Sequence, residues 1–238
     1  MARPGAFQFD RERANNLEAG LKYKAGALAF NLSVYRTDYD DLQVNIFDGT
    51  LNFNVRNAAG ARTQGVEADA RIAVTDRLTL SGAVAYLDFK FTDFTSGQCF
   101  FQQVPGPGGF CDYTGKRNAL SPRWSGNANA DFRQPLTDAL KLGINLNMDF
   151  SSSFIASANL DPRTRQSGFA RLGARIALAA DDDRWEVALV GRNLTNQRIL
   201  QQAGPLPLST TITRGGGIAY TGIYDRPRNI ALAFNLRF

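Results

Sequence analysis

The C-terminal segment 230–238 alternates strictly between apolar residues and small or polar ones, and this pattern constrains the fold more than any other feature. One set of positions carries Ile230, Leu232, Phe234, Leu236 and Phe238. A period of two places these residues on one face of a β-strand. The apolar face continues to the last residue, where soluble chains are usually disordered. The pattern therefore predicts a strand whose apolar face contacts lipid, as in the closing strand of a transmembrane β-barrel.

The same alternation recurs along the chain and predicts about nine long strands. We expect them at 17–23, 28–46, 66–74, 78–86, 124–133, 140–150, 172–178, 185–189 and 230–238. Several run to about ten residues, which suffices for a tilted strand to cross a bilayer. The fold class predicted is all-β, an antiparallel transmembrane β-barrel segment.

The connections between these strands alternate in length, which favours an outer-membrane barrel over a soluble sandwich. Short turns follow Lys24, Val74, Arg133 and Ala179. Long connections follow Thr92, Ala156 and Leu200, and Asp48-Gly49 is a hairpin turn signal in the remaining one. Outer-membrane barrels have short periplasmic turns and long external loops. A soluble β-sandwich with one wet face stays open as the alternative.

The two faces of the strands predict different surroundings. Aromatic residues near the ends of the apolar rows fit interfacial girdles: Trp124, Phe132, Phe150, Trp185 and Phe238. The polar rows would line a lumen: Glu67, Asp69, Arg71, Asn127, Asn129, Asp131, Arg133, Lys141, Asn145, Asn147 and Asp149. This wall could form a channel or hold a plug. For any single residue, a hydrated wall of mutually satisfied polar groups is the favoured interpretation.

Composition excludes several classes of function. The 238 residues include no histidine, so Ser-His-Asp and Cys-His nucleophilic sites are excluded and no enzyme is predicted. The net charge of +5 is spread along the chain, which argues against nucleic-acid binding.

Cys99 and Cys111 lie in a loop rich in Gly and Pro, and we expect a disulfide between them. No metal site or cofactor is predicted, and no apolar run is long enough for a transmembrane helix.

Five stretches together resemble the C-terminal half of a TonB-dependent outer-membrane receptor. They are 12–22 (ERANNLEAGLK), 35–43 (YRTDYDDLQ), 57–68 (NAAGARTQGVEA), 191–196 (GRNLTN) and 226–238, which begins with RPR. Their order and spacing cover essentially the whole chain. The family's barrel has 22 strands around an N-terminal plug domain.

The resemblance implies that residues 1–238 form the C-terminal portion of such a barrel, with the plug and the upstream strands missing. Nine strands are an odd number, and an open sheet would leave two unpaired edges in lipid. The residues after Met1 also lack the apolar core of a signal peptide. We therefore expect that the chain is part of a longer receptor.

The function implied by the resemblance is active uptake of a scarce nutrient across the bacterial outer membrane, foremost a ferric siderophore. Alternatives are a small autonomous barrel with a structural or pore role, and a secreted β-sandwich binding module. The expected partners are outer-membrane lipid, the barrel-assembly machinery, TonB through the missing plug, and a small ligand. Loops 45–54, 92–121, 157–166 and 201–217 would build the outer vestibule.

Two groups of residues are candidates for roles within this function. Four loop aromatics could contact the ligand, although packing of the loop against itself is the favoured interpretation: Phe100, Phe101, Phe110 and Tyr113. Three residues of the closing strand would form the barrel-assembly signal: Phe234, Leu236 and Phe238.

Overall fold

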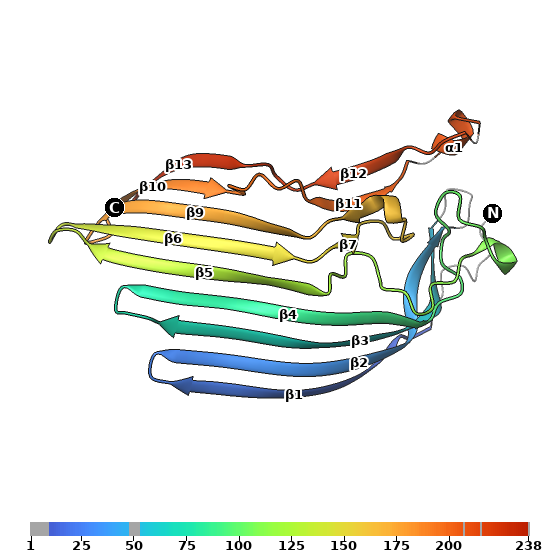
Figure 1. Ribbon diagram of the computed structural model, residues 1–238, viewed down its shortest axis with the longest axis horizontal. Helices are drawn as coiled ribbons and strands as arrows, with labels where there is room; N and C mark the ends of the chain where they lie inside the picture. Colours follow the sequence, from blue (N-terminus) through green and yellow to red (C-terminus); the bar gives the residue numbers. More distant parts are fainter. Residues whose placement is uncertain (1–9, 48–52, 207, 215, 238) are drawn as a thin grey trace.

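Nine antiparallel strands form one continuous sheet that contains most of the chain (Figure 1). The computed structural model describes residues 10–47, 53–206, 208–214 and 216–237. In spatial order the strands are β1 (Arg13–Ala25), β2 (Leu28–Phe47), β3 (Phe53–Ala73), β4 (Leu78–Asp93), β5 (Trp124–Pro135), β6 (Leu140–Ser151), β9 (Phe169–Ala180), β10 (Trp185–Arg192) and β13 (Asn229–Leu236). This architecture confirms the predicted long-stranded antiparallel fold, present as an open sheet rather than a closed barrel.

The two ends of the sheet differ, as the connection lengths predicted. The turns β1–β2, β3–β4, β5–β6 and β9–β10 lie together at one end, and the long connections lie at the other (Figure 1). The long connections carry the small elements β7 (Phe154–Ile155), β8 (Arg165–Gln166), β11 (Leu200–Pro205), α1 (Ser209–Ile212) and β12 (Tyr220–Tyr224). We call this the loop end. Among the described residues, no helix has the length and apolar character that crossing a membrane requires.

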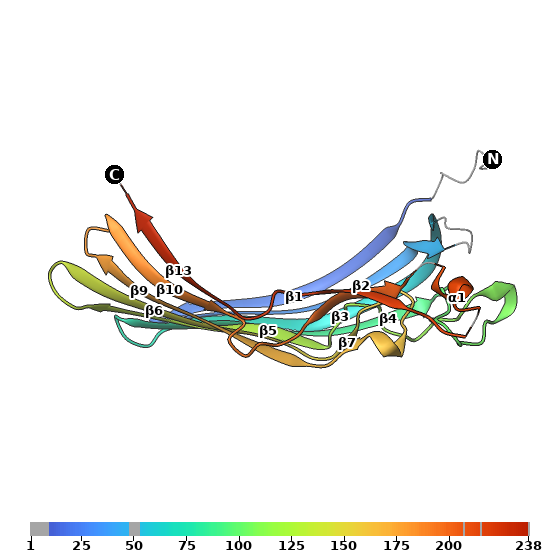
Figure 2. The same ribbon diagram turned by 90° about the horizontal axis from the view of Figure 1, so that it is seen from above.

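The apolar rows lie on an uncovered face of the sheet, which is curved and twisted (Figure 2). Register pairs Leu21 with Leu32 and Leu189 with Leu232, so the rows of neighbouring strands join into one belt. Leu17 and Leu232 expose 76% and 75% of their surface. In the part of the chain that is described, no second layer covers this belt, so the β-sandwich alternative is wrong for these residues.

The opposite face carries a lattice of polar side chains that satisfy one another. The amide of Asn31 donates to Asp69 (2.9 Å) across β2 and β3. Similar bonds join Asn145 to Asp131 (3.1 Å) and Arg175 to Glu186. The structure thus favours the interpretation of these residues as a satisfied polar wall.

Several predicted boundaries differ from the structure, and two of these differences matter most for the loop end. β3 begins at Phe53 and not at Val66, because 53–65 pairs with the extended outer half of β2. Gly65 permits close pairing of β3 with β4 on its other side, since a Cβ there would clash with the carbonyl oxygen of Tyr86. The last long connection begins directly after β10, at 193 rather than 201. The predicted Asp48-Gly49 turn and Phe238 lie outside the described residues.

Candidate functional site

An aromatic cluster at the loop end supports the first long connection, 94–123. Phe91 lies at the end of β4 and packs edge-on against Phe94, with 4.8 Å between ring centroids. Tyr113 returns from the loop to pack edge-on against Phe94 at 5.3 Å. Ala59 and Ala61 of β3 complete the buried cluster, and their small side chains leave room for the rings. The loop is therefore folded onto the sheet.

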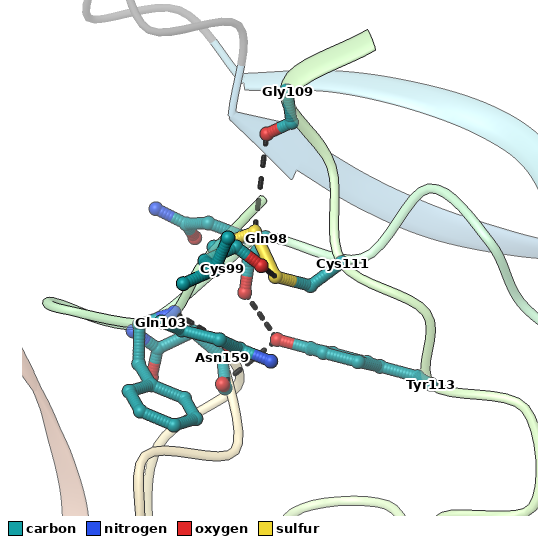
Figure 3. The surroundings of a disulfide bond; sticks show 9 residues. Gln98, Cys99, Gln103, Gly109, Cys111, Tyr113 and Asn159 are labelled. Carbon is teal, nitrogen blue, oxygen red and sulfur yellow. Dashed lines mark hydrogen bonds between the residues drawn. A yellow bond between two sulfur atoms is a disulfide. The ribbon is translucent and has the colours of Figure 1, made fainter. Parts of the chain in front are cut away.

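The disulfide-bonded segment of this loop lies over Tyr113 (Figure 3). The structure joins Cys99 and Cys111, with Cα atoms 5.1 Å apart. The Tyr113 hydroxyl lies within hydrogen-bonding reach of the carbonyl oxygens of Gln98 and Asn159 (2.7 Å to Asn159) and can donate to either. Burial raises the pKa of Tyr113, so the hydroxyl keeps its proton. This contact joins the first long loop to the second, 152–168.

A fully buried carboxylate, Asp161, organises the second loop. Its Oδ1 accepts hydrogen bonds from the backbone N–H and the Nε of Arg163, both at 2.9 Å. The Tyr220 hydroxyl donates to Oδ2 from the third loop. Burial alone would raise the pKa of Asp161, but the hydrogen bonds from Arg163 and Tyr220 outweigh it and lower the pKa. Asp161 is therefore ionised at neutral pH.

Three aromatic rings surround the Arg163 guanidinium. Its Cζ lies 5.9 Å from the ring centroid of Phe100, and 5.5 Å from those of Phe101 and Tyr220. These distances fit cation–π contacts. Nη2 also donates to the carbonyl oxygen of Phe101 at 2.6 Å. We call Asp161, Arg163, Tyr220, Phe100 and Phe101 the loop hub, because it joins all three long loops.

A pocket of about 670 Å³ lies beside the loop hub, between the same three loops. Its lining combines apolar residues such as Leu120 and Ile218 with the polar residues Asn159 and Ser209. Asn159 Oδ1 and Ser209 Oγ are buried and have no hydrogen-bond partner among the described residues. A concave, partly apolar surface with a few converging polar groups suits a small ligand. The described residues contain no group of three or more potential metal-ligating side chains.

The four predicted loop aromatics lie in different surroundings in the structure. Tyr113 is 3% exposed and packs the loop, whereas Phe100 and Phe101 are half-buried beside Arg163. Phe110 is half-buried and lies outside the loop hub. Sequence reasoning missed Asp161, Arg163 and Tyr220.

A local signal for Asp161 does exist in the sequence. Asp161 caps a short 3₁₀ turn that continues with Pro162, and an Asp followed by Pro is a known start of such a turn. That signal predicts a capped turn. It does not predict the approach of Tyr220, which lies 59 residues further along the chain.

Comparison with known proteins supports the same architecture. Residues 2–194 match the family model described as TonB dependent receptor-like, beta-barrel. The ferric yersiniabactin uptake receptor FyuA of Yersinia pestis is similar in structure, with a TM-score of 0.72 at 16% identity over 95% of this chain. The siderophore receptor PiuA of Acinetobacter baumannii gives 0.67 at 17% identity over 94%. The ferric-catecholate import receptor Fiu of E. coli K12 gives 0.62 at 15% identity over 97%.

The chain spans 30%, 28% and 28% of the lengths of these three receptors, respectively. At this level of identity the three structures establish the fold alone. The match to the family model covers most of the sequence and agrees with the strand order, the exposed apolar belt and the long loops at one end. This chain belongs to the TonB-dependent receptor β-barrel family.

Proposed function

We propose that this chain forms the C-terminal part of the barrel wall of an outer-membrane receptor that takes up a ferric siderophore. The family consists of transport receptors of the bacterial outer membrane, and the similar structures include a ferric yersiniabactin uptake receptor and a siderophore receptor. Ligand capture would take place at the loop end. Passage would require TonB, acting through a plug domain.

The observation that carries this proposal is the loop hub above a lipid-compatible sheet. The buried Asp161 holds Arg163 and Tyr220 by hydrogen bonds, and Arg163 in turn contacts the rings of Phe100 and Phe101. Half-buried Phe100 and Phe101 offer apolar faces to a ligand, and the neighbouring pocket offers two polar atoms that have no partner within the described part of the chain. Frames of this kind favour binding because the side chains are ordered before the ligand arrives.

The closing strand supports a second part of the proposal, recognition by the barrel-assembly machinery. Phe234 and Leu236 expose 64% and 50% of their surface on the apolar face of β13.

Deleting Phe238 from the full-length receptor should lower the fraction that inserts into the outer membrane, measured by heat-modifiable migration. An internal deletion of Gly216, in the third long loop, is the control. Unchanged insertion would contradict the assembly role.

Transport tests the main proposal. Cells that express the full-length receptor containing this chain are grown under iron limitation and offered catecholate, hydroxamate or carboxylate siderophores loaded with ⁵⁵Fe. We expect uptake of at least one class in cells with TonB and none without it. A Phe101→Ala variant should need a higher concentration of the ferric siderophore for half-maximal uptake. The Arg198→Gln variant, changed at an exposed position outside the loop hub, should not. A folded, surface-exposed receptor that takes up none of the three classes would contradict the siderophore assignment.

A further inference from the structure

A pocket of about 550 Å³ lies where the apolar belt meets the loop end. Trp124 lines it and begins β5 on the same face as the belt, with 49% of its surface exposed. Its ring lies 4.9 Å from that of Tyr86, the belt residue opposite it on β4. Beyond Tyr86 the same face becomes charged, with Asp88 and Lys90 paired at 3.5 Å. Trp and Tyr favour the interface between lipid tails and water.

The described residues that line this pocket carry three positive charges and no negative one. Arg117, Arg123 and Arg165 line it together with Trp124, and no described Asp or Glu does. None of the three arginines forms an ion pair with a described residue. Guanidinium groups gathered without carboxylates favour a bound anion. We call this the arginine pocket.

Arg117 is held in place but is not fully satisfied. Its Nη2 donates to the carbonyl oxygens of Leu87 (2.8 Å) and Ser121 (3.0 Å), which fixes the guanidinium against β4. Its Nη1 is buried and has no hydrogen-bond acceptor among the described residues. Burial and the nearby charge of Arg123 lower the pKa of Arg117, while Asp88 opposes this effect. An unpaired buried donor of a charged group is costly, and an anion in the pocket would offset that cost.

Hydroxyl groups and apolar side chains complete the arginine pocket. Ser153 Oγ accepts from Arg165 Nη2 at 2.8 Å and positions that side chain. Ser152 Oγ accepts from the backbone N–H of Trp124 at 3.0 Å, and its own proton remains available. Phe154 and Ile155 add apolar surface. An occupant would thus have an anionic group with several oxygen atoms and an apolar part continuous with the belt.

We propose that the arginine pocket binds the phosphate group of an anionic lipid in the outer leaflet. The proposal rests on the membrane location inferred under the proposed function, but not on which nutrient is transported. A lipid is favoured over free phosphate because the exposed Trp124 joins the pocket to the belt, where acyl chains lie. The three guanidinium groups provide charge-assisted hydrogen bonds to phosphate oxygens.

The test uses the full-length receptor in a neutral detergent, with bound lipid counted by native mass spectrometry. The probes are dihexanoyl phosphatidic acid, dihexanoyl phosphatidylcholine and inorganic phosphate. The test variant is Arg123→Gln with Arg165→Gln, two exposed positions whose replacement should leave the fold intact. The control is Arg184→Gln, in the turn between β9 and β10 at the opposite end of the sheet, where the side chain is 79% exposed.

We expect phosphatidic acid to bind at a saturable site, and the double variant to weaken this binding by about tenfold or more. Arg184→Gln should leave it unchanged, and added salt should weaken it. Equal affinity for phosphatidylcholine, unchanged affinity in the double variant, or equally tight binding of inorganic phosphate would each overturn the proposal. Heat-modifiable migration of every variant monitors the barrel separately, so a failure of the barrel assignment is distinguishable from a failure of the pocket.

Discussion

At the residue scale, the loop end depends on one buried charge. Asp161 is 0% exposed and remains ionised because Arg163 and Tyr220 donate to both of its carboxylate oxygens. Burying a carboxylate without such partners would be strongly unfavourable. The aromatic contacts of Arg163 follow from this arrangement, since the carboxylate fixes the guanidinium between the rings.

Replacing Asp161 should loosen the loops without unfolding the sheet. We expect Asp161→Ala to lower the local stability of 94–123 and 152–168 by about 2 kcal/mol, a value reduced from the range for fully buried pairs because Arg163 is 40% exposed. Hydrogen exchange of the loop amides in the full-length receptor measures this change. The exposed Asp112 is the control, and Asp112→Ala should have a much smaller effect. Equal protection of the loop amides from hydrogen exchange in the Asp161→Ala variant and the wild type would contradict the role of the loop hub.

The contribution of the loop hub to stability should be present only within a defined pH range. Burial, together with the hydrogen bond to Asp161, raises the pKa of Tyr220 to about 12. A raised pKa in the folded state gives stability that is fully present below the unfolded value of about 10 and is lost as the pH rises toward 12. The lowered pKa of Asp161 gives stability that is present above about pH 4 and is lost as the pH falls further.

Absorbance at 295 nm against pH detects this titration, because tyrosinate absorbs there. The difference between wild type and Tyr220→Phe should show a group that ionises near pH 12. Tyr224→Phe, four residues further along β12, is the control. A difference curve centred near pH 10 would show that Asp161 does not contact Tyr220 in solution.

At the element scale, the strands were predictable because alternation is a local property. The predicted bounds of β5 and β6 nearly equal the observed ones, because the polarity of each residue indicates which face of the strand it occupies. The outer half of β3 was missed because Asn57, Ala59 and Ala61 carry little apolar signal. Their strand conformation comes from backbone pairing with β2 and from the rings packed on Ala59 and Ala61.

The two faces of the sheet should respond differently to an added charge. Leu146, in the middle of β6, is 51% exposed on the belt, whereas Asn129 of β5 lies on the polar face. We expect Leu146→Lys to cost about 2–4 kcal/mol in a lipid bilayer, and Asn129→Lys less than about 1 kcal/mol. Urea unfolding of the full-length receptor in vesicles measures both values. Similar costs for the two variants would contradict the assignment of the belt to lipid.

At the scale of the whole molecule, the sheet has two open edges. Among the described residues, β1 pairs only with β2, and β13 pairs only with β10. Unpaired backbone groups are strongly unfavourable in lipid, and exposed edges promote association between chains. The open sheet therefore requires further strands to be stable in a membrane.

Expressed alone, residues 1–238 should fail to form a discrete barrel. We expect aggregation in detergent, observed by size-exclusion chromatography, and no heat-modifiable band on electrophoresis. The full-length receptor, handled identically, should give both a single peak and the band. A monodisperse, heat-modifiable 238-residue species would support the alternative of a small autonomous barrel.

The sequence by itself determined the strands, their faces, the alternation of short and long connections, and the family. Each of these follows from the period of two or from motifs within a few residues of one another. Only the tertiary structure decided the loop hub and the arginine pocket. Asp161 contacts Tyr220, and Arg117 and Arg165 line one pocket, across loops that carry no periodic pattern. Their contacts depend on where the sheet holds the ends of each loop, and that placement is a property of the whole fold.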